Sequence, residues 1–207
     1  MSSSGHVSST TDPYADRQLV PEESTHRALA LYKSFINNPT IDVRTRLSCL
    51  AKTVSILDAL PVVRGFDSAG KFGVNRNTGA QPANLPLLQL LVDRTTMYRD
   101  MSAVHRQLGD VQNAAFGYDR TTLLLEALIR NMNASQNITS SGCVDGAATQ
   151  PTCFESERHL ATLRVYSTNM LLQVLGDWRI VEQALGRNSK ADKLLARAEK
   201  WRASRDA

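Results

Sequence analysis

The sequence predicts an all-α protein. Only 6% of its 207 residues are aromatic, and Leu, Ala, Arg and Gln crowd the segments in which apolar residues recur every three or four positions. Residues 160–185 form the clearest such segment, with a stripe along about seven turns of helix. The stripe consists of Leu160, Leu163, Ser167, Leu171, Val174, Trp178, Val181 and Leu185. We expect this helix to lie in the core with Trp178 largely buried, and we expect Val165 to widen the buried stripe.

The chain is predicted to form one helical domain, residues 21–207, after a disordered tail. Residues 1–20 are rich in Ser, Thr and Asp and show no apolar period. The hydrophobic fraction of the whole chain, 42%, suffices for a single core. No run approaches the ~20 apolar residues of a membrane span, and the N-terminal region lacks the hydrophobic centre of a signal peptide. Membrane insertion is therefore not expected.

The first helical region is predicted over residues 22–60. Pro21 and the acidic residues after it are typical of a first helical turn. The residue before Pro39 is pushed out of helical conformation, so a turn or kink interrupts the region. Thr40 can cap the segment that follows. The region is therefore either one broken helix or two separate helices.

A long loop is predicted over residues 62–86, which are dense in Gly, Asn and Pro. Loops of this length inside a domain are usually functional or form a long overhand connection. Pro86 then opens a long helix that is expected to reach Val111. A break or bend at residues 116–118 separates it from a further helix that ends at Met132.

A second loop is predicted over residues 133–152. It holds two glycosylation sequons, at Asn133 and Asn137. The sequons lie close to Cys143 and Cys153, and this clustering favours a secreted protein. In such a protein we expect Cys143 and Cys153 to form a disulfide.

We predict no enzymatic activity, no catalytic residue and no cofactor. Cys49 lies on an apolar face and is expected to stay free, the four histidines are far apart, and no carboxylate pair recurs within a motif. The three cysteines lack the spacing of metal ligands, and His105 has no second His or Cys three or four positions away. No metal site is therefore assigned.

The positive charge of the chain gathers at its C-terminus. From Arg179 onward there are eight Lys or Arg against four Asp or Glu, so this segment alone supplies the net charge of +4. Gly186 and Asn188 are expected to end the central helix, and Ser189 to cap a final short basic helix. Such a helix suits nucleic acid, an anionic glycan or an acidic protein surface, or it is simply a solvated face.

The order of the predicted parts is long helix, long loop, long helix, helix, long loop, long helix. In four-helix bundles, long connections permit the up-up-down-down arrangement of helical cytokines. We therefore predict a four-helix bundle with up-up-down-down topology, long crossover loops and extra short helices.

Residues 171–185, LLQVLGDWRIVEQAL, resemble the last helix of the interleukin-six type long-chain helical cytokines, in particular the ciliary neurotrophic factor, cardiotrophin and leukaemia inhibitory factor group. In that group a Leu-rich helix carries a tryptophan close to a Leu-Gln-x-Leu step, and its basic end helps to contact receptors. An exposed Phe with a Lys three residues later also binds a signalling receptor. Here Phe154 is followed by Glu157, so Phe154 is either such a contact or a hydrophobic staple.

The resemblance implies a secreted cytokine or growth factor, leaderless or present as its mature chain, that binds cell-surface cytokine receptors through exposed helix faces. The predicted receptor-binding residues are Arg164, Arg179, Glu182, Arg187 and Phe154. The first four avoid the buried stripe, and replacing exposed charges of this kind is expected to change stability little. The alternative is a cytoplasmic helical adaptor whose basic C-terminal helix binds a protein partner or nucleic acid. For the cytokine, nucleic acid is not an expected partner.

Overall fold

The computed structural model describes residues 21–36, 38, 40–71, 85–141 and 151–206. Over these residues the chain is all-helical and contains no strand, which confirms the predicted all-α class. The helices are α1 (Pro21–Ile36), α2 (Val43–Ala59), α3 (Pro61–Lys71), α4 (Leu85–Gln107), α5 (Val111–Ser141), α6 (Pro151–Ala184) and α7 (Asn188–Asp206). The predicted tail, residues 1–20, lies outside the described residues.

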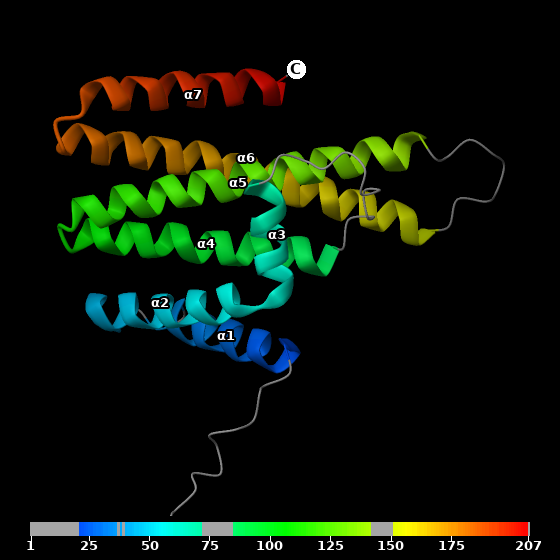
Figure 1. Cartoon of the computed structure of the whole chain (residues 1–207), viewed down its shortest axis with the longest axis horizontal. Helices are drawn as coiled ribbons and strands as arrows, with labels where there is room; N and C mark the ends of the chain where they lie inside the picture. The colour runs from blue at the N-terminus through cyan, green and yellow to red at the C-terminus, as the bar shows by residue number, and fades with distance from the viewer. Residues whose placement is uncertain (1–20, 37, 39, 72–84, 142–150, 207) are drawn as a thin grey trace, which may run out of the picture.

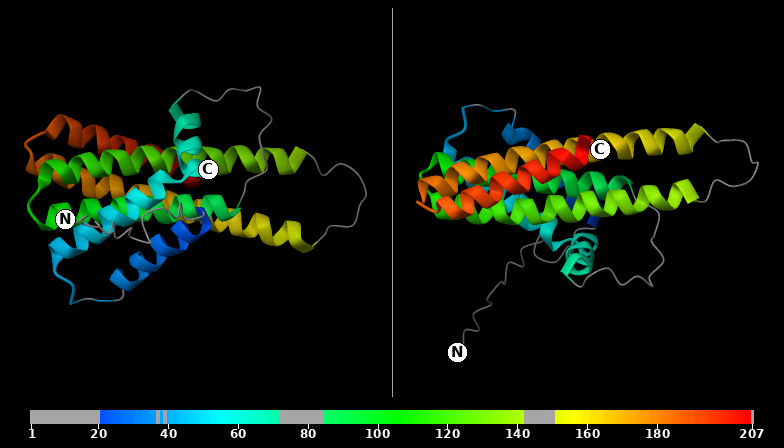
Figure 2. Two further views of the ribbon diagram at one scale, coloured as in Figure 1. Left: turned by 60° about the horizontal axis from the view of Figure 1, so that its bottom comes forward. Right: turned by 90° about the horizontal axis from the view of Figure 1, so that it is seen from above.

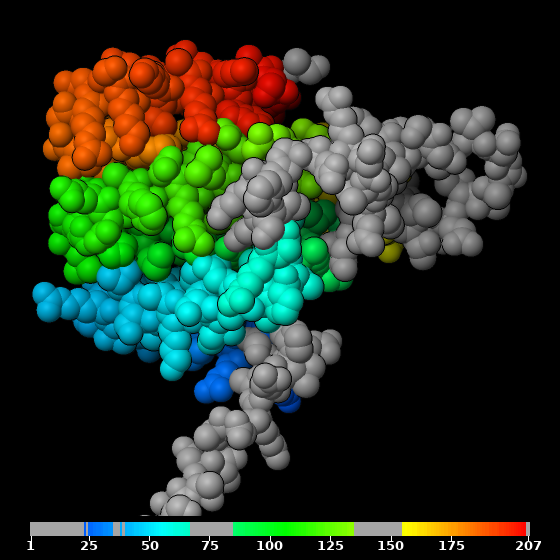
Figure 3. Space-filling model, in the orientation of Figure 1, coloured from blue at the N-terminus to red at the C-terminus, as the bar shows by residue number. Residues whose placement is uncertain are grey.

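Except for α3 and α4, helices that follow one another in the chain also pack against one another (Figure 1). α4 packs on α5, α5 on α6 and α6 on α7, while α2 packs between α1 and α4. α4 also contacts α6, so α4, α5 and α6 share the centre of the core. Figure 3 shows the resulting layers on one face of the molecule, with α4 and α5 between α2 and the pair α6 and α7.

Two short turns fix the directions of the C-terminal helices. Leu108, Gly109 and Asp110 join α4 to α5, and Leu185, Gly186 and Arg187 join α6 to α7. Gly109 and Gly186 have φ angles of 75° and 72°, a region in which any Cβ would be strained. Turns this short join antiparallel helices, and Figure 2 shows α4, α5, α6 and α7 running in alternating directions. α4, α5, α6 and α7 therefore alternate in direction. The predicted four-helix bundle counted the last of these as an extra helix, and its up-up-down-down order stays a prediction.

The first helical region consists of two separate helices. Asp42, rather than the predicted Thr40, caps α2, because its carboxylate accepts hydrogen bonds from the backbone N–H groups of Arg44 (3.2 Å) and Thr45 (2.9 Å). These hydrogen bonds lower the pKa of Asp42. The hydroxyl of Thr40 instead donates to Asn38 Oδ1 at 2.6 Å, and Thr40 lies two residues before the N-cap position.

The predicted loop over residues 62–86 is wrong in its first part. Residues 61–71 form α3, with Pro61 at the first position, where a helix tolerates proline. The predicted break at residues 116–118 is also wrong, because α5 is continuous there. Gly117 serves close packing: a Cβ at this position would lie 2.2 Å from Ser102 Oγ of α4. The chain turns earlier, at Gly109.

The predicted second loop, residues 133–152, is helical wherever the structure describes it, at residues 133–141 and 151–152. α5 continues to Ser141, so both sequons lie on a helix, and α6 already begins at Pro151. Asn, Ser and Thr have only modestly unfavourable helix propensity, and here they extend a helix that packs along α6. The final helix was predicted to be short, but α7 spans 19 residues.

The buried stripe of α6 is confirmed. Each of its residues from Leu160 to Val181 is buried, and Trp178 is only 2% exposed. The side chains of α4 and α5 complete this core, chiefly through Leu91, Met97, Tyr118, Leu125, Leu128, Ile129 and Met132. Val165 differs from the prediction, because it is exposed on the opposite side of α6.

Candidate functional site

A groove opens between α2, α4 and α5, and it encloses about 360 Å³. Tyr98 and Met101 of α4 lie along it, with α2 on one side and α5 on the other. Small side chains create the space: Ala51 and Ser55 line it from α2, and Gly117 lines it from α5. A cavity of this size lies at the lower end of the range known for ligand sites.

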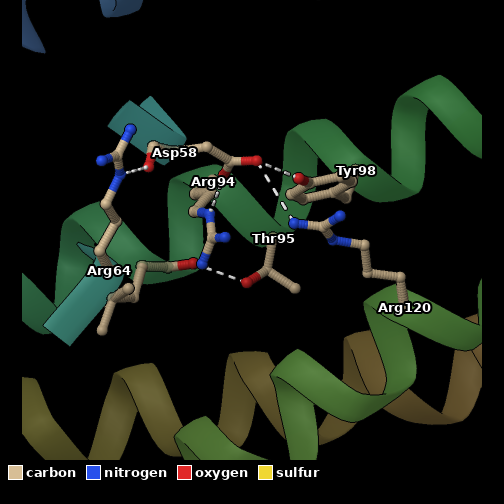
Figure 4. A network of polar contacts seen from close by, with 7 residues as sticks. Asp58, Arg64, Arg94, Thr95, Tyr98 and Arg120 are labelled. Atoms are coloured by element: carbon tan, nitrogen blue, oxygen red, sulfur yellow. Dashed lines mark hydrogen bonds and ion pairs between the residues drawn. The ribbon is translucent and has the colours of Figure 1, made fainter. Parts of the chain in front are cut away.

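One carboxylate, that of Asp58 on α2, organises the polar end of the groove (Figure 4). Arg94 Nε of α4 donates to Asp58 Oδ1 at 2.7 Å, and the hydroxyl of Tyr98 donates to Oδ2. Arg120 Nη2 of α5 lies 3.3 Å from the same Oδ2. Arg64 Nε of α3 donates to the backbone carbonyl of Asp58 at 3.2 Å. Four helices therefore meet at this residue.

Burial makes the pair of Asp58 and Arg94 essential to the fold. The side chain of Arg94 is only 1% exposed, and a buried guanidinium is tolerated only where a carboxylate pairs with it. Burial and the hydrogen bond to Asp58 also raise the pKa of Tyr98 well above its usual value. Tyr98 therefore remains a hydrogen-bond donor at any physiological pH.

Arg120 lies at the mouth of the groove. Its guanidinium stacks on the ring of Tyr98, 4.6 Å from the centroid, and its side chain is 42% exposed. Phe116, one turn earlier on α5, is 67% exposed, and Leu123, three positions after Arg120, is also exposed. These three residues form a continuous ridge along α5, because positions at this spacing share one helix face.

Of the predicted receptor-binding residues, Glu182 is not on the surface. It is completely buried, and its Oε1 accepts hydrogen bonds from Trp178 Nε1 at 2.7 Å and from Lys190 Nζ at 2.9 Å. Burial by itself raises the pKa of Glu182, but the hydrogen bonds from Lys190 and Trp178 outweigh it and the pKa is lowered. Its expected exposure was wrong because α7 folds back and covers this face of α6.

The three predicted arginines do not form one exposed surface. Arg187 is half-exposed in the turn after α6, and its Nη1 lies 3.5 Å from Glu182 Oε2. Arg164 and Arg179 are partly buried. Arg179 Nε is enclosed and has no hydrogen-bond partner among the described residues. Phe154 lies in the first turn of α6, and its side chain is outside the described structure.

After its first turns, α6 presents no charged residue at its exposed positions. Over residues 162–184, all of which the structure describes, the exposed positions hold no Asp, Glu, Lys or Arg, although these types make up 21% of the chain. The exposed residues are Thr162, Val165, Tyr166, Asn169, Gln173, Gly176, Ile180, Gln183 and Ala184. We call them the outer α6 face. Solvated helix faces are usually charged, so an uncharged face that exposes Val165, Tyr166 and Ile180 is a candidate surface for a partner.

Sequence reasoning missed the outer α6 face, because it sought charged residues for contact and assigned apolar residues to the core. The available signal was Val165 and Ile180, two apolar residues that fall outside the stripe of three- and four-residue steps. The Asp58 groove gave no local signal, because Asp58, Arg94 and Arg120 are far apart in sequence.

The predicted modification sites are only partly described. Asn133 is exposed on α5, and Asn137 lies on the same helix. Cys143 is outside the described residues, Cys153 lies in the first turn of α6 with its side chain undescribed, and the disulfide therefore stays a prediction. Cys49 is a free thiol packed partly buried against the core.

No group of three or more His, Cys, Asp or Glu in the described part of the chain is arranged to hold a metal ion. His105 Nδ1 lies 3.1 Å from Asp110 Oδ2 and is thus engaged in the turn between α4 and α5. Among the helices as described, none has a segment long and apolar enough to span a membrane.

Comparison of the chain with protein-family models, with curated proteins and with solved structures finds no match in any of the three.

Proposed function

We propose that this protein is a helical cytokine or growth factor that binds cell-surface receptor ectodomains through exposed helix faces. The observation that carries the proposal is the outer α6 face, with Val165, Tyr166 and Ile180 exposed on an otherwise uncharged strip. The resemblance at residues 171–185 falls on the same helix. The proposal assigns no catalytic activity and no cofactor.

The dimensions of the outer α6 face suit a protein partner. From Thr162 to Ile180 it extends for ~27 Å along a straight helix, which is long enough for one side of a standard interface of about 800 Å² per partner. Its exposed aromatic residue, Tyr166, is of a type enriched in such interfaces. Gly176 lies in the middle of the strip with open space above it, so a partner could approach the helix backbone closely there.

In this proposal the four main helices of the bundle are α2, α4, α5 and α6. Contacts link α2 to α4, α4 to α5, and α6 to both α4 and α5. The ion pair between Asp58 and Arg120 adds a link from α2 to α5. α1, α3 and α7 would then be additional helices packed around the bundle.

Binding to purified receptor ectodomains tests the proposal. The shared signalling receptors of interleukin-six type cytokines would be immobilised and the folded protein passed over them. We expect saturable binding that Val165→Asp weakens about 5- to 150-fold, the range of about 1–3 kcal/mol for an interface anchor. Val62→Asp on α3 is the matched control, because the exposures are 52% for Val165 and 54% for Val62. Binding that is absent, or equally weakened by both variants, would contradict the proposal.

The alternative is a cytoplasmic adaptor that binds a protein or nucleic acid through its basic C-terminal helix. Its supporting observation is that α7 exposes Lys193, Lys200, Arg202 and Arg205. Peptide mapping of the natural protein separates the two functions. A glycan at Asn133 or Asn137 supports the secreted cytokine, because those sequons are modified in the secretory pathway, whereas binding to nucleic acid that weakens with salt supports the adaptor.

A further inference from the structure

The Asp58 carboxylate faces two guanidinium groups at the polar end of the groove. Arg94 is buried and lies at 2.7 Å, whereas Arg120 is partly exposed and lies at 3.3 Å. The buried cation needs the carboxylate more, because it has lost its hydration. The charge of Arg120 is therefore left largely available to a further anion.

Arg120 is also held in place before any partner arrives. Its guanidinium lies over the ring of Tyr98, and the hydroxyl of Tyr98 is fixed by its hydrogen bond to Asp58. A planar, stacked guanidinium can bind a carboxylate through two parallel hydrogen bonds and loses little side-chain freedom when it does so. This preorganisation suits a carboxylate, because its two oxygens match the two N–H groups of the guanidinium edge.

Next to Arg120 the groove is apolar and roomy. Val54 and Met101 line it, and Phe116 is exposed at its rim. Ser55 has a small side chain and Gly117 has none, so both leave space in the groove. Met is a side chain that adapts to the shape of what it contacts. The space beside Met101 therefore suits one aromatic or large aliphatic side chain.

The ridge of Phe116, Arg120 and Leu123 continues beyond the groove. Leu123 is exposed on α5 but does not line the cavity. A small molecule confined to the cavity would leave Leu123 exposed to water. An extended segment of a protein would cover both the cavity and Leu123. The extent of the apolar surface thus favours a peptide over a metabolite.

We propose that the groove between α2, α4 and α5 binds a short acidic segment of a partner protein. A carboxylate of that segment pairs with Arg120, and a neighbouring aromatic or large aliphatic residue occupies the space beside Met101. This site goes beyond the proposed function and uses other helices than the outer α6 face, so either can fail without the other.

The site can be tested by titrating the ¹⁵N-labelled full chain with the peptide acetyl-Glu-Phe-Glu-Leu-amide. We expect chemical-shift changes at Tyr98, Met101 and Phe116, and binding at least tenfold tighter than for the same peptide with Lys in place of Glu or Ser in place of Phe. Phenylacetate is added as a small aromatic carboxylate. If it binds as tightly as the peptide, the site takes small molecules and the proposal of a protein partner is wrong.

Two variants locate the binding. Arg120→Gln should weaken the peptide at least tenfold, and Arg130→Gln, an exposed arginine on the same helix, should leave its affinity unchanged. Ser55→Phe fills the groove without removing a charge. It therefore still tests peptide binding at the groove if the Arg120→Gln variant fails to fold. Unchanged affinity in a folded Ser55→Phe protein, or shift changes that lie away from the groove, would overturn the proposal.

Discussion

The indole of Trp178 donates a hydrogen bond to Glu182, with Nε1 and Oε1 2.7 Å apart, one turn further along α6. Lys190 of α7 donates to the same oxygen, and its ammonium lies 4.7 Å from the centre of the Trp178 ring. Arg187 lies beside the other carboxylate oxygen. Through these contacts the buried carboxylate stabilises the turn between α6 and α7. α7 therefore packs on the core and is not a detached basic tail.

Replacing Glu182 by Leu should destabilise the protein by about 1–3 kcal/mol, because the buried Trp178 N–H loses its acceptor. Urea denaturation followed by circular dichroism measures the change. Gln183→Leu is the control: Gln183 is the next residue but is exposed, so its effect should stay within about 0.5 kcal/mol. Equal effects of the two substitutions would contradict the buried role of Glu182.

The stability contributed by Glu182 should disappear in acid. Its pKa in the folded protein is below the ordinary value of 4.5, so the unfolded chain binds the proton more readily than the folded protein. The contribution is therefore complete above the unfolded pKa and is lost as the pH falls through the folded pKa. We expect the free energy of unfolding to fall less between about pH 5 and pH 3 in Glu182→Gln than in the unmodified protein.

Asp42 and Asp110 also have lowered pKa values, so the unmodified protein loses stability in acid for more than one reason. The comparison with Glu182→Gln isolates one contribution, since both of these carboxylates remain in the variant. Identical pH profiles for the two proteins would show that Glu182 is not ionised in a favourable environment.

Replacing Trp178 by Ala should cost about 3–5 kcal/mol, as for other buried aromatic residues. Trp201 of α7 is the useful comparison, because it is only partly buried and its Nε1 donates to Glu126 at 3.2 Å. Trp201→Ala should therefore lower the free energy of unfolding clearly less than Trp178→Ala does. A neutral Trp178→Ala substitution in chemical denaturation would be incompatible with α6 as the central helix.

How far the sequence predicts the fold depends on whether the information is local. The stripe of α6 is local, since it repeats every three or four residues, and both the helix and the burial of Trp178 follow from it. The burial of Glu182 is not local: it depends on Lys190, which reaches it only after the chain reverses at Gly186. A charged residue off the apolar stripe was for that reason assigned to the surface.

The candidate groove could not be predicted from local sequence patterns. Asp58 contacts residues 36, 40 and 62 positions away in the chain, and nothing in the sequence around it indicates these partners. α3 was missed because Gly and Asp within it are typical of loops. Pro61, a residue suited to the first position of a helix, was the local signal that could have found it.

Replacing Asp58 by Ala should destabilise the protein by about 3–5 kcal/mol, since the buried Arg94 loses the carboxylate that lies 2.7 Å from its Nε. Chemical denaturation gives the value. Asp192→Ala, at an exposed position on α7, should cost less than about 0.5 kcal/mol. A loss at Asp58 no larger than that at Asp192 would mean that Arg94 finds other compensation.

The central claim, that this protein signals through cell-surface receptors, is tested most directly by the response of cells that carry the shared receptors of interleukin-six type cytokines. Added folded protein should cause dose-dependent, saturable receptor phosphorylation, and Val165→Asp should shift the dose for half-maximal response upward by a factor of about 5 to 150, while Val62→Asp should not shift it. No phosphorylation at any dose of the folded, unmodified protein would contradict the claim.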